Sequence, residues 1–120
     1  LVRPMQQEDW PEDPNLVKVV VDRSFRALYF SRSVIPYHRK DPRKTTSPGQ
    51  PYFRHMGIYG YRSDVLEKIA ALPPSPLEIM ESLEQLRWME NGFRIQTRIT
   101  RYSSLGVDTP EDLERIRSHF

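Results

Sequence analysis

The sequence predicts a mixed α/β domain in which strands outnumber helices. The run from Leu16 to Val21 is apolar and β-branched, as strands are. Residues Phe53 to Tyr61 alternate between two faces with a period of two, which also indicates a strand. The stretch Leu77 to Asn91 has the length and apolar content of a helix, and Gly92 is a common helix stop. Only part of the pattern fits a regular strand–helix–strand unit.

The order of the elements follows from local signals. Three prolines in residues 1–14 argue for an extended leading segment rather than a helix. A turn at Asp22–Ser24 joins Leu16–Val21 to a second strand at Phe25–Ser31, so the two strands form a hairpin. Residues 36–51 are proline-rich and basic and are expected to form a loop. The elements expected after it are a strand at Phe53–Tyr61, a helix from Ser63 to about Ala71, a break at Pro73–Pro76, a helix at Leu77–Asn91, a strand at Phe93–Thr100, and a last helix from Pro110 to about His119.

Bulk composition excludes several classes of protein. The chain has 120 residues, enough for one small domain, and it begins at Leu1, so we expect a piece of a longer protein. It has no cysteine, which excludes disulfides and thiolate metal sites. No apolar run approaches the ~20 residues of a membrane span, and no signal-peptide pattern is present. These features favour a soluble protein of the cytoplasm, with no membrane partner.

The net charge of +2 is weak evidence for any partner. Basic residues cluster from Arg32 to Lys44 and could meet nucleic acid or a small anion, although a solvated loop is the simpler interpretation for most of them. Arg32 follows a predicted strand, and Arg39 lies seven residues on. Two guanidinium groups there could grip a carboxylate, but spacing alone favours two surface arginines.

Two further pairs could bind a ligand. His55 and Tyr59 share one face of a predicted strand, and Gly57 between them leaves room for close approach. This polar row would suit a hydroxyl-rich ligand, and a half-buried strand face is an equal alternative. Glu84 and Gln85 lie between apolar residues of a predicted helix and could bind sugar hydroxyls; alternatively, Glu84 pairs with a nearby arginine on the helix surface.

The stretch from Gly106 to Leu113 ends an apolar segment and starts a helix. Thr109 can cap that helix, Pro110 fits its first turn, and Asp112 completes a capping box. Asp108 is not explained by these local roles. A carboxylate at the tip of a strand can hold a hard cation against phosphate oxygens, but this stretch alone favours a second, solvated cap.

Taken together, six segments resemble the CMP-Kdo synthetases, also called 3-deoxy-manno-octulosonate cytidylyltransferases. They occur in family order and spacing from about Asn15 onwards. The segments are Asn15–Val20, Ala27–Ser33 with Ile35–Pro36, Arg54–Arg62, Pro74–Glu78, Leu83–Arg87 and Gly106–Arg115. The resemblance implies the Rossmann-like nucleotidyltransferase fold of nucleotide-diphospho-sugar transferases, with a mixed sheet and a dimerisation hairpin.

The resemblance also implies a reaction, in which CTP and the sugar acid Kdo give CMP-Kdo and pyrophosphate for lipopolysaccharide inner-core synthesis. It implies Mg²⁺ as cofactor, CTP and Kdo as substrates, a homodimer, and no nucleic-acid partner. Carried over by position, the implied site residues are Arg32 and Arg39 of the sugar-acid pocket, His55 and Tyr59 as strand-borne sugar contacts, Glu84 and Gln85 as helix contacts to Kdo hydroxyls, and Asp108 as catalytic metal ligand.

Two motifs of the family are not in this sequence: its opening nucleotide loop and its second acidic motif, Gln-Gly-Asp-Glu-Pro. We therefore expect residues 1–120 to be the C-terminal half of one cytidylyltransferase domain, inactive when alone. Two alternatives stay open. The enzyme could act on another sugar acid, such as a sialic-acid-like or amino-sugar analogue, or the chain could be a non-catalytic binding or assembly module.

Overall fold

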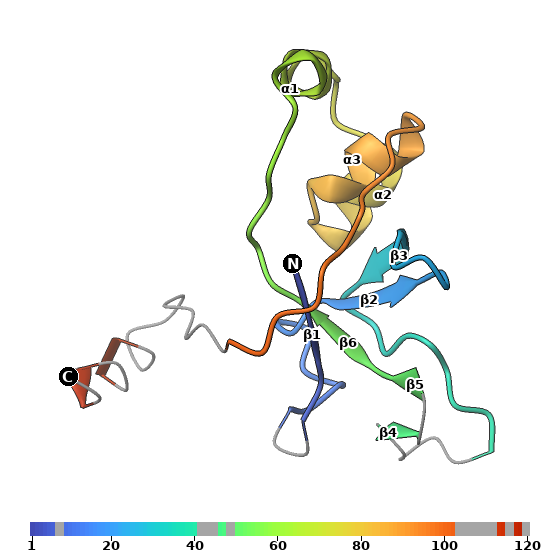
Figure 1. Ribbon diagram of the computed structural model, residues 1–120, viewed down its shortest axis with the longest axis vertical. Helices are drawn as coiled ribbons and strands as arrows, with labels where there is room; N and C mark the ends of the chain where they lie inside the picture. The colour runs from blue at the N-terminus through green and yellow to red at the C-terminus, as the bar shows by residue number, and fades with distance from the viewer. Residues whose placement is uncertain (7–8, 41–45, 48–49, 103–112, 115–116, 119–120) are drawn as a thin grey trace.

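The centre of the computed structural model is a four-stranded antiparallel sheet (Figure 1). The structure describes residues 1–6, 9–40, 46–47, 50–102, 113–114 and 117–118. Across the sheet the strands run in the order β1 (Val2–Pro4), β6 (Phe53–His55), β2 (Lys18–Val21) and β3 (Ala27–Ser31). The predicted α/β class is confirmed. All named strand pairs are antiparallel, and one isolated parallel bridge joins Val2 to Ile99.

The predicted hairpin forms from β2 and β3, with Val19 opposite Phe30. Its turn is held by the Asp22 carboxylate, which accepts hydrogen bonds from the main-chain N–H groups of Ser24 (2.7 Å) and Arg26 (2.9 Å). Phe25 has a φ of 59°, in the left-handed region. Because a residue in that conformation cannot lie in a strand, β3 begins two residues later than the sequence predicts.

Two segments contain strands that the sequence does not predict. β1 lies in the segment expected to be merely extended, and it forms the sheet edge beside β6. Pro4 is tolerated there because an edge strand has one side without a partner strand. Within the predicted 36–51 loop, β4 (Thr46–Ser47) pairs with β5 (Gln50–Pro51) as a separate two-stranded ladder.

The predicted strand Phe53–Tyr61 is wrong beyond His55. The Ile58 N–H donates to the Met56 carbonyl (2.7 Å), a tight turn that ends the ladder. The predicted strand Phe93–Thr100 is also wrong. Its backbone bonds first to the hairpin, through Thr97 N–H to the Phe25 carbonyl (2.8 Å), and then to β1. It changes partner midway and makes isolated bridges instead of a ladder.

The helices differ from the prediction at one point, where a single predicted helix is divided in two. Helix α1 (Ser63–Ala70) forms as expected. The single helix predicted over Leu77–Asn91 is two short ones, α2 (Pro76–Glu81) and α3 (Gln85–Glu90), which meet at Ser82 with φ 51° and ψ 49°. A left-handed residue cannot continue an α-helix, so the chain turns there. Of the predicted last helix, Leu113, Glu114 and Arg117 are helical, and its other residues before Ser118, together with His119, lie outside the described residues.

The core lies where the sheet meets the α2–α3 pair. It consists of Val2, Val19, Phe30, Leu83 and Leu86, each less than 7% exposed. Burying large apolar side chains of this kind contributes about 1.5–3 kcal/mol each. In the part of the chain that the structure describes, no helix has both the length and the apolar character that a membrane span needs.

A buried carboxylate ties β1 to β6. Asp9 accepts two hydrogen bonds from Arg3 Nη2 (2.7 and 2.9 Å) and lies 3.3 Å from Arg54 Nη1. The side chain of Asp9 is 5% exposed and that of Arg3 is 11% exposed. A charge pair that is so far removed from water is strongly destabilised when one member is lost, because the other charge stays buried.

We therefore expect Asp9→Ala to lower the free energy of unfolding by about 3 kcal/mol or more, because Arg3 would keep its charge without a partner. Chemical denaturation measures this. The control is Asp64→Ala, which breaks the ion pair with Arg62 on the surface, where Asp64 is 53% exposed. That change should lower stability far less, because the exposed ion pair is already solvated by water. Equal losses in the two variants would contradict the structural role of Asp9.

Candidate functional site

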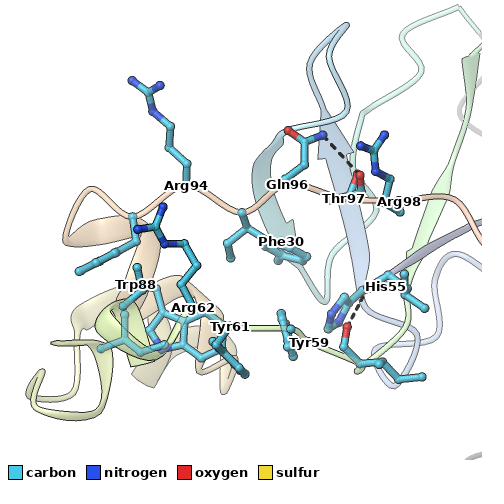
Figure 2. A pocket seen from close by; sticks show the side chains of 17 residues that line it. Phe30, His55, Tyr59, Tyr61, Arg62, Trp88, Arg94, Gln96, Thr97 and Arg98 are labelled. Atoms are coloured by element: carbon cyan, nitrogen blue, oxygen red, sulfur yellow. Dashed lines mark hydrogen bonds between the residues drawn. The ribbon is translucent and has the colours of Figure 1, made fainter. Parts of the chain in front are cut away.

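A cavity of about 410 Å³ lies between three parts of the chain (Figure 2). One wall is the segment that follows β6 and leads into α1, the second is α3, and the third is the segment 93–98. Figure 2 shows His55 and Tyr59 at one side, Tyr61 and Trp88 at the other, and Phe30 above them. The volume is that of a small-molecule pocket, and its lining mixes aromatic rings with a few polar groups, as such pockets do.

His55 and Tyr59, which the sequence paired on one strand face, are brought together in this cavity. Their ring centroids are 5.3 Å apart, and His55 also lies 5.1 Å from Phe30 in an edge-to-face contact. Among the described residues, His55 Nε2 and the Tyr59 hydroxyl are buried without a hydrogen-bond partner. Burial lowers the pKa of His55 to about 4 and raises the pKa of Tyr59. Both side chains are therefore neutral at physiological pH and each can hydrogen-bond a ligand hydroxyl.

Two aromatic residues of the cavity were not predicted as site residues. Tyr61 and Trp88 contact each other edge to face at 5.5 Å, and Tyr59 packs on Trp88 at 5.1 Å. Trp88 reads in the sequence as one more apolar residue of a helix, so no local signal sets it apart. Tyr61 shares the predicted alternation with Tyr59, and that spacing could have suggested it.

Glu84 and Gln85 lie at the start of α3, where Glu84 is exposed to solvent and Gln85 is buried. Gln85 is 5% exposed, and its Nε2 is buried without a partner among the described residues. Glu84 is exposed and precedes the first helical residue. Burial is the main cause of the raised pKa of Tyr61, and the negative charge of Glu84 adds to it. Neither residue lines the cavity directly.

Neither of the two arginines predicted as site residues lines the cavity. Arg32 lies at the end of β3, and its guanidinium donates to three main-chain carbonyls, those of Glu81 (2.7 Å), Pro14 (2.8 Å) and Ser82 (3.2 Å). Those bonds use three of the five guanidinium N–H groups. Arg39 is exposed, in a turn within the predicted 36–51 loop. The structure thus puts Arg32 in a role within the chain that spacing could not indicate.

The predicted metal ligand, Asp108, lies outside the described residues. Within the described ranges, no group of three or more His, Cys, Asp or Glu side chains is arranged to hold a metal ion. Mg²⁺ takes oxygen ligands in near-octahedral geometry, and the described residues provide no such set.

Comparison with known proteins agrees with the sequence pattern. A family model described as cytidylyltransferase matches residues 1–99. The 3-deoxy-manno-octulosonate cytidylyltransferase of Parabacteroides distasonis is 46% identical over 119 residues, covering 96% of this chain and 47% of that protein. The protein of the same name from Pelodictyon phaeoclathratiforme is 53% identical over 119 residues, covering 98% of this chain and 46% of that protein.

A solved structure is similar as well. It is that of a CMP:2-keto-3-deoxy-manno-octonic acid synthetase complexed with CTP, with a TM-score of 0.83 and 42% identity. The match covers 98% of this chain and 46% of that one. This supports the nucleotidyltransferase fold expected from the sequence. The chain spans about half the length of the relatives that it matches.

The buried imidazole should make stability depend on pH. The folded-state pKa of His55 is about 4, below its ordinary 6.5, so the unfolded chain takes up a proton first as the pH falls. The contribution of His55 to stability is complete above pH 6.5 and is lost progressively as the pH falls from there towards 4. NMR titration of the His55 ring should give a midpoint near 4. In denaturant unfolding, His55→Gln should flatten the slope of stability against pH between 4 and 6.5.

The matched control is Tyr59→Phe, which removes the neighbouring buried hydroxyl and keeps the imidazole. It should retain the slope of the unmodified chain. A His55 midpoint near 6.5, or equal slopes in all three proteins, would show that the imidazole is accessible to water and not buried in the cavity.

Proposed function

Because the chain belongs to the cytidylyltransferase family, we propose that it supplies the sugar-binding half of an enzyme that couples CTP to a sugar acid. The relatives that it matches at 46% and 53% identity bear the name 3-deoxy-manno-octulosonate cytidylyltransferase. The proposed substrates of the complete enzyme are accordingly CTP and Kdo, and the products are CMP-Kdo and pyrophosphate, for lipopolysaccharide synthesis in the cytoplasm.

The observation that carries the proposal is the pair of unpartnered polar atoms in the cavity. His55 Nε2 and the Tyr59 hydroxyl are both buried, and neither has a partner among the described residues. An unmade hydrogen bond of a buried group costs about 1–3 kcal/mol. A polyhydroxylated sugar would supply donors and acceptors to both atoms, and the rings of Tyr61 and Trp88 would exclude water beside it.

The other proposed contacts rest on the family resemblance. Gln85 adds a third buried polar atom without a partner, and the exposed Glu84 lies beside it. The Glu84 carboxylate is proposed to accept hydrogen bonds from sugar hydroxyls, and Gln85 Nε2 is proposed to donate one to a sugar oxygen. Arg32 and Arg39 are proposed to meet the sugar carboxylate, Arg32 with the N–H groups that its main-chain bonds leave over.

The proposed reaction is a substitution at phosphorus. The anomeric hydroxyl of the sugar attacks the α-phosphorus of CTP, a new P–O bond forms, and the bond to the β-phosphate oxygen breaks. The hydroxyl proton passes to solvent water, and pyrophosphate leaves with the electron pair of the broken bond. Catalysis of this kind depends mainly on positioning and on stabilising charge. The part proposed for this chain is to bind the sugar and orient its anomeric hydroxyl.

Mg²⁺ is proposed as the cofactor of the complete enzyme, where it would screen the charge of the triphosphate. Asp108 is proposed as its ligand on the basis of the Gly-Val-Asp-Thr-Pro sequence alone. We also propose that residues 1–120 correspond to the C-terminal half of one domain and that the complete enzyme is a homodimer. These proposals rest on the resemblance.

The test is pyrophosphate release from CTP in the presence of Kdo and Mg²⁺. It uses this chain alone and the same chain joined to the N-terminal half of a relative. We expect activity only in the joined form. In that form, Gln85→Ala should raise the KM for Kdo about tenfold, the effect of about 1.4 kcal/mol, and leave the KM for CTP unchanged. The control Glu67→Ala changes an exposed residue of α1 and should leave both constants unchanged.

Each other outcome would point elsewhere. A sialic acid analogue that outcompetes Kdo would make the enzyme a cytidylyltransferase for another sugar acid. A joined protein that folds but releases no pyrophosphate would favour a binding or assembly module. Activity of the chain alone would mean that it holds a nucleotide site of its own.

The metal role has a separate test in the joined enzyme. Asp108→Asn keeps the size of the side chain and removes its charge, so it should lower kcat and weaken the dependence of the rate on Mg²⁺ concentration. Titration of the initial rate with MgCl₂ measures this. If the half-saturating Mg²⁺ concentration stays the same, Asp108 is not a ligand.

A further inference from the structure

Glu81, which ends α2, places its carboxylate at the end of β3. Its Oε1 accepts hydrogen bonds from Ser31 Oγ (2.6 Å) and from the Tyr29 hydroxyl (3.4 Å), and its Oε2 accepts one from the Arg32 main-chain N–H (2.9 Å). Ser31 itself is only 2% exposed. Charge-assisted hydrogen bonds of this kind are stronger than neutral ones. One carboxylate thus joins a strand to a helix about 50 residues away.

Arg32, at the end of β3, in turn donates hydrogen bonds to main-chain carbonyls at the end of α2. Its Nε donates to the Glu81 main-chain carbonyl (2.7 Å), and its Nη2 donates to the Ser82 carbonyl (3.2 Å). Because helix-terminal carbonyls have no partner inside the helix, these bonds satisfy groups that would otherwise need water. The end of β3 therefore holds both the last side chain and the last carbonyls of α2. We call these contacts of Glu81 with Ser31 and Arg32 the β3–α2 clamp.

The clamp acts on the corner that starts α3. Ser82 is left-handed, and Leu83 and Leu86 after it are buried in the core. Helix α3 has only six residues, and its N-cap residue, Glu84, makes no side-chain capping bond. A helix that short is unstable by itself, so its position depends on what holds its ends. The clamp lies three residues before Glu84 and four before Gln85.

We propose that Glu81 is a positioning residue of the sugar site, which holds the α2–α3 corner and so fixes Trp88 in the cavity wall and Glu84 and Gln85 beside it. The inference rests on the proposed function for the identity of the substrate. Glu81 acts through the corner and not by touching the sugar, because Ser31, Tyr29 and the Arg32 N–H already occupy its oxygens.

The ionisation of Glu81 fits this role. Burial, the largest influence, raises its pKa, but the hydrogen bonds from Ser31, the Arg32 N–H and Tyr29 outweigh burial and hold the pKa below its ordinary value. The carboxylate is charged at neutral pH and accepts all three bonds. A glutamine has one acceptor oxygen and would keep only part of the contact.

The test uses the joined enzyme, with Glu81→Ala and Glu81→Gln. Glu81→Ala should raise the KM for Kdo at least tenfold, with the KM for CTP within twofold of the unmodified value, and Glu81→Gln should lie between. In the chain itself, the amides of Leu86 and Arg87, which close the first turns of α3, should exchange with deuterium at least tenfold faster in Glu81→Ala. Glu81→Gln keeps the measurement possible if the alanine variant does not fold.

The matched control is Asp22→Asn. Asp22 also accepts several hydrogen bonds, but in the hairpin turn at the other end of β3. The Asp22→Asn substitution should lower the melting temperature, but it should leave both the KM for Kdo and the deuterium exchange of the α3 amides unchanged. A KM for Kdo that is equally insensitive to Glu81→Ala, or α3 exchange that does not change, would overturn the inference.

Failure of the proposed function would look different. In that case the unmodified joined enzyme would show no Kdo-dependent release of pyrophosphate, and the sugar-specific part of the inference would fall with it. The exchange rates of Leu86 and Arg87 would still decide whether Glu81 holds the corner, because they do not depend on any substrate.

Discussion

The junction between the end of β3 and the α2–α3 corner is the contact on which the rest of the structure depends. On its apolar side, Phe30 of β3 and Leu86 of α3 are almost completely buried. On its polar side, Glu81 and Arg32 exchange hydrogen bonds between the strand and the helix. Because the cavity lies between α3 and the segment after β6, this junction fixes one wall relative to the other. Apolar burial supplies the attraction, and the polar contacts set the angle.

The parts of the fold that the sequence predicts are those with local causes. The β2–β3 hairpin follows from a β-branched run before a turn and an aromatic-rich run after it, and α1 follows from a start at Ser63 and a break at Pro73–Pro76. The parts that it misses depend on distant partners. The segment 93–100 alternates like a strand but bonds first to the hairpin and then to β1. Ser82 breaks a helix that its neighbours favour, at the corner that Arg32, the residue after β3, holds through the Glu81 and Ser82 carbonyls.

The candidate site likewise has parts that local sequence predicts and parts that depend on distant partners. The pairing of His55 with Tyr59 is predicted from a strand that does not extend past His55, yet the two rings are 5.3 Å apart. In a continuous strand, residues four apart would be separated by about 13 Å. The chain instead turns between them, where the Ile58 N–H bonds to the Met56 carbonyl, so the two rings meet although the predicted strand ends at His55. Trp88 gives no comparable signal, because a helical tryptophan among apolar residues reads as core. Its place in the cavity wall depends on the α2–α3 corner, which no local pattern reveals.

Buried polar atoms without a hydrogen-bond partner mark positions where the sequence is not optimal for the stability of the fold. His55 Nε2, the Tyr59 hydroxyl and Gln85 Nε2 are all buried without a partner among the described residues, each at a cost of about 1–3 kcal/mol. A core selected for stability alone would replace such groups with apolar ones of similar size. Sequences depart from local consistency mainly where function requires it. Of the five such atoms in the described residues, these three come from one cavity and the helix beside it, which argues that their partners arrive with a ligand or with the rest of the enzyme.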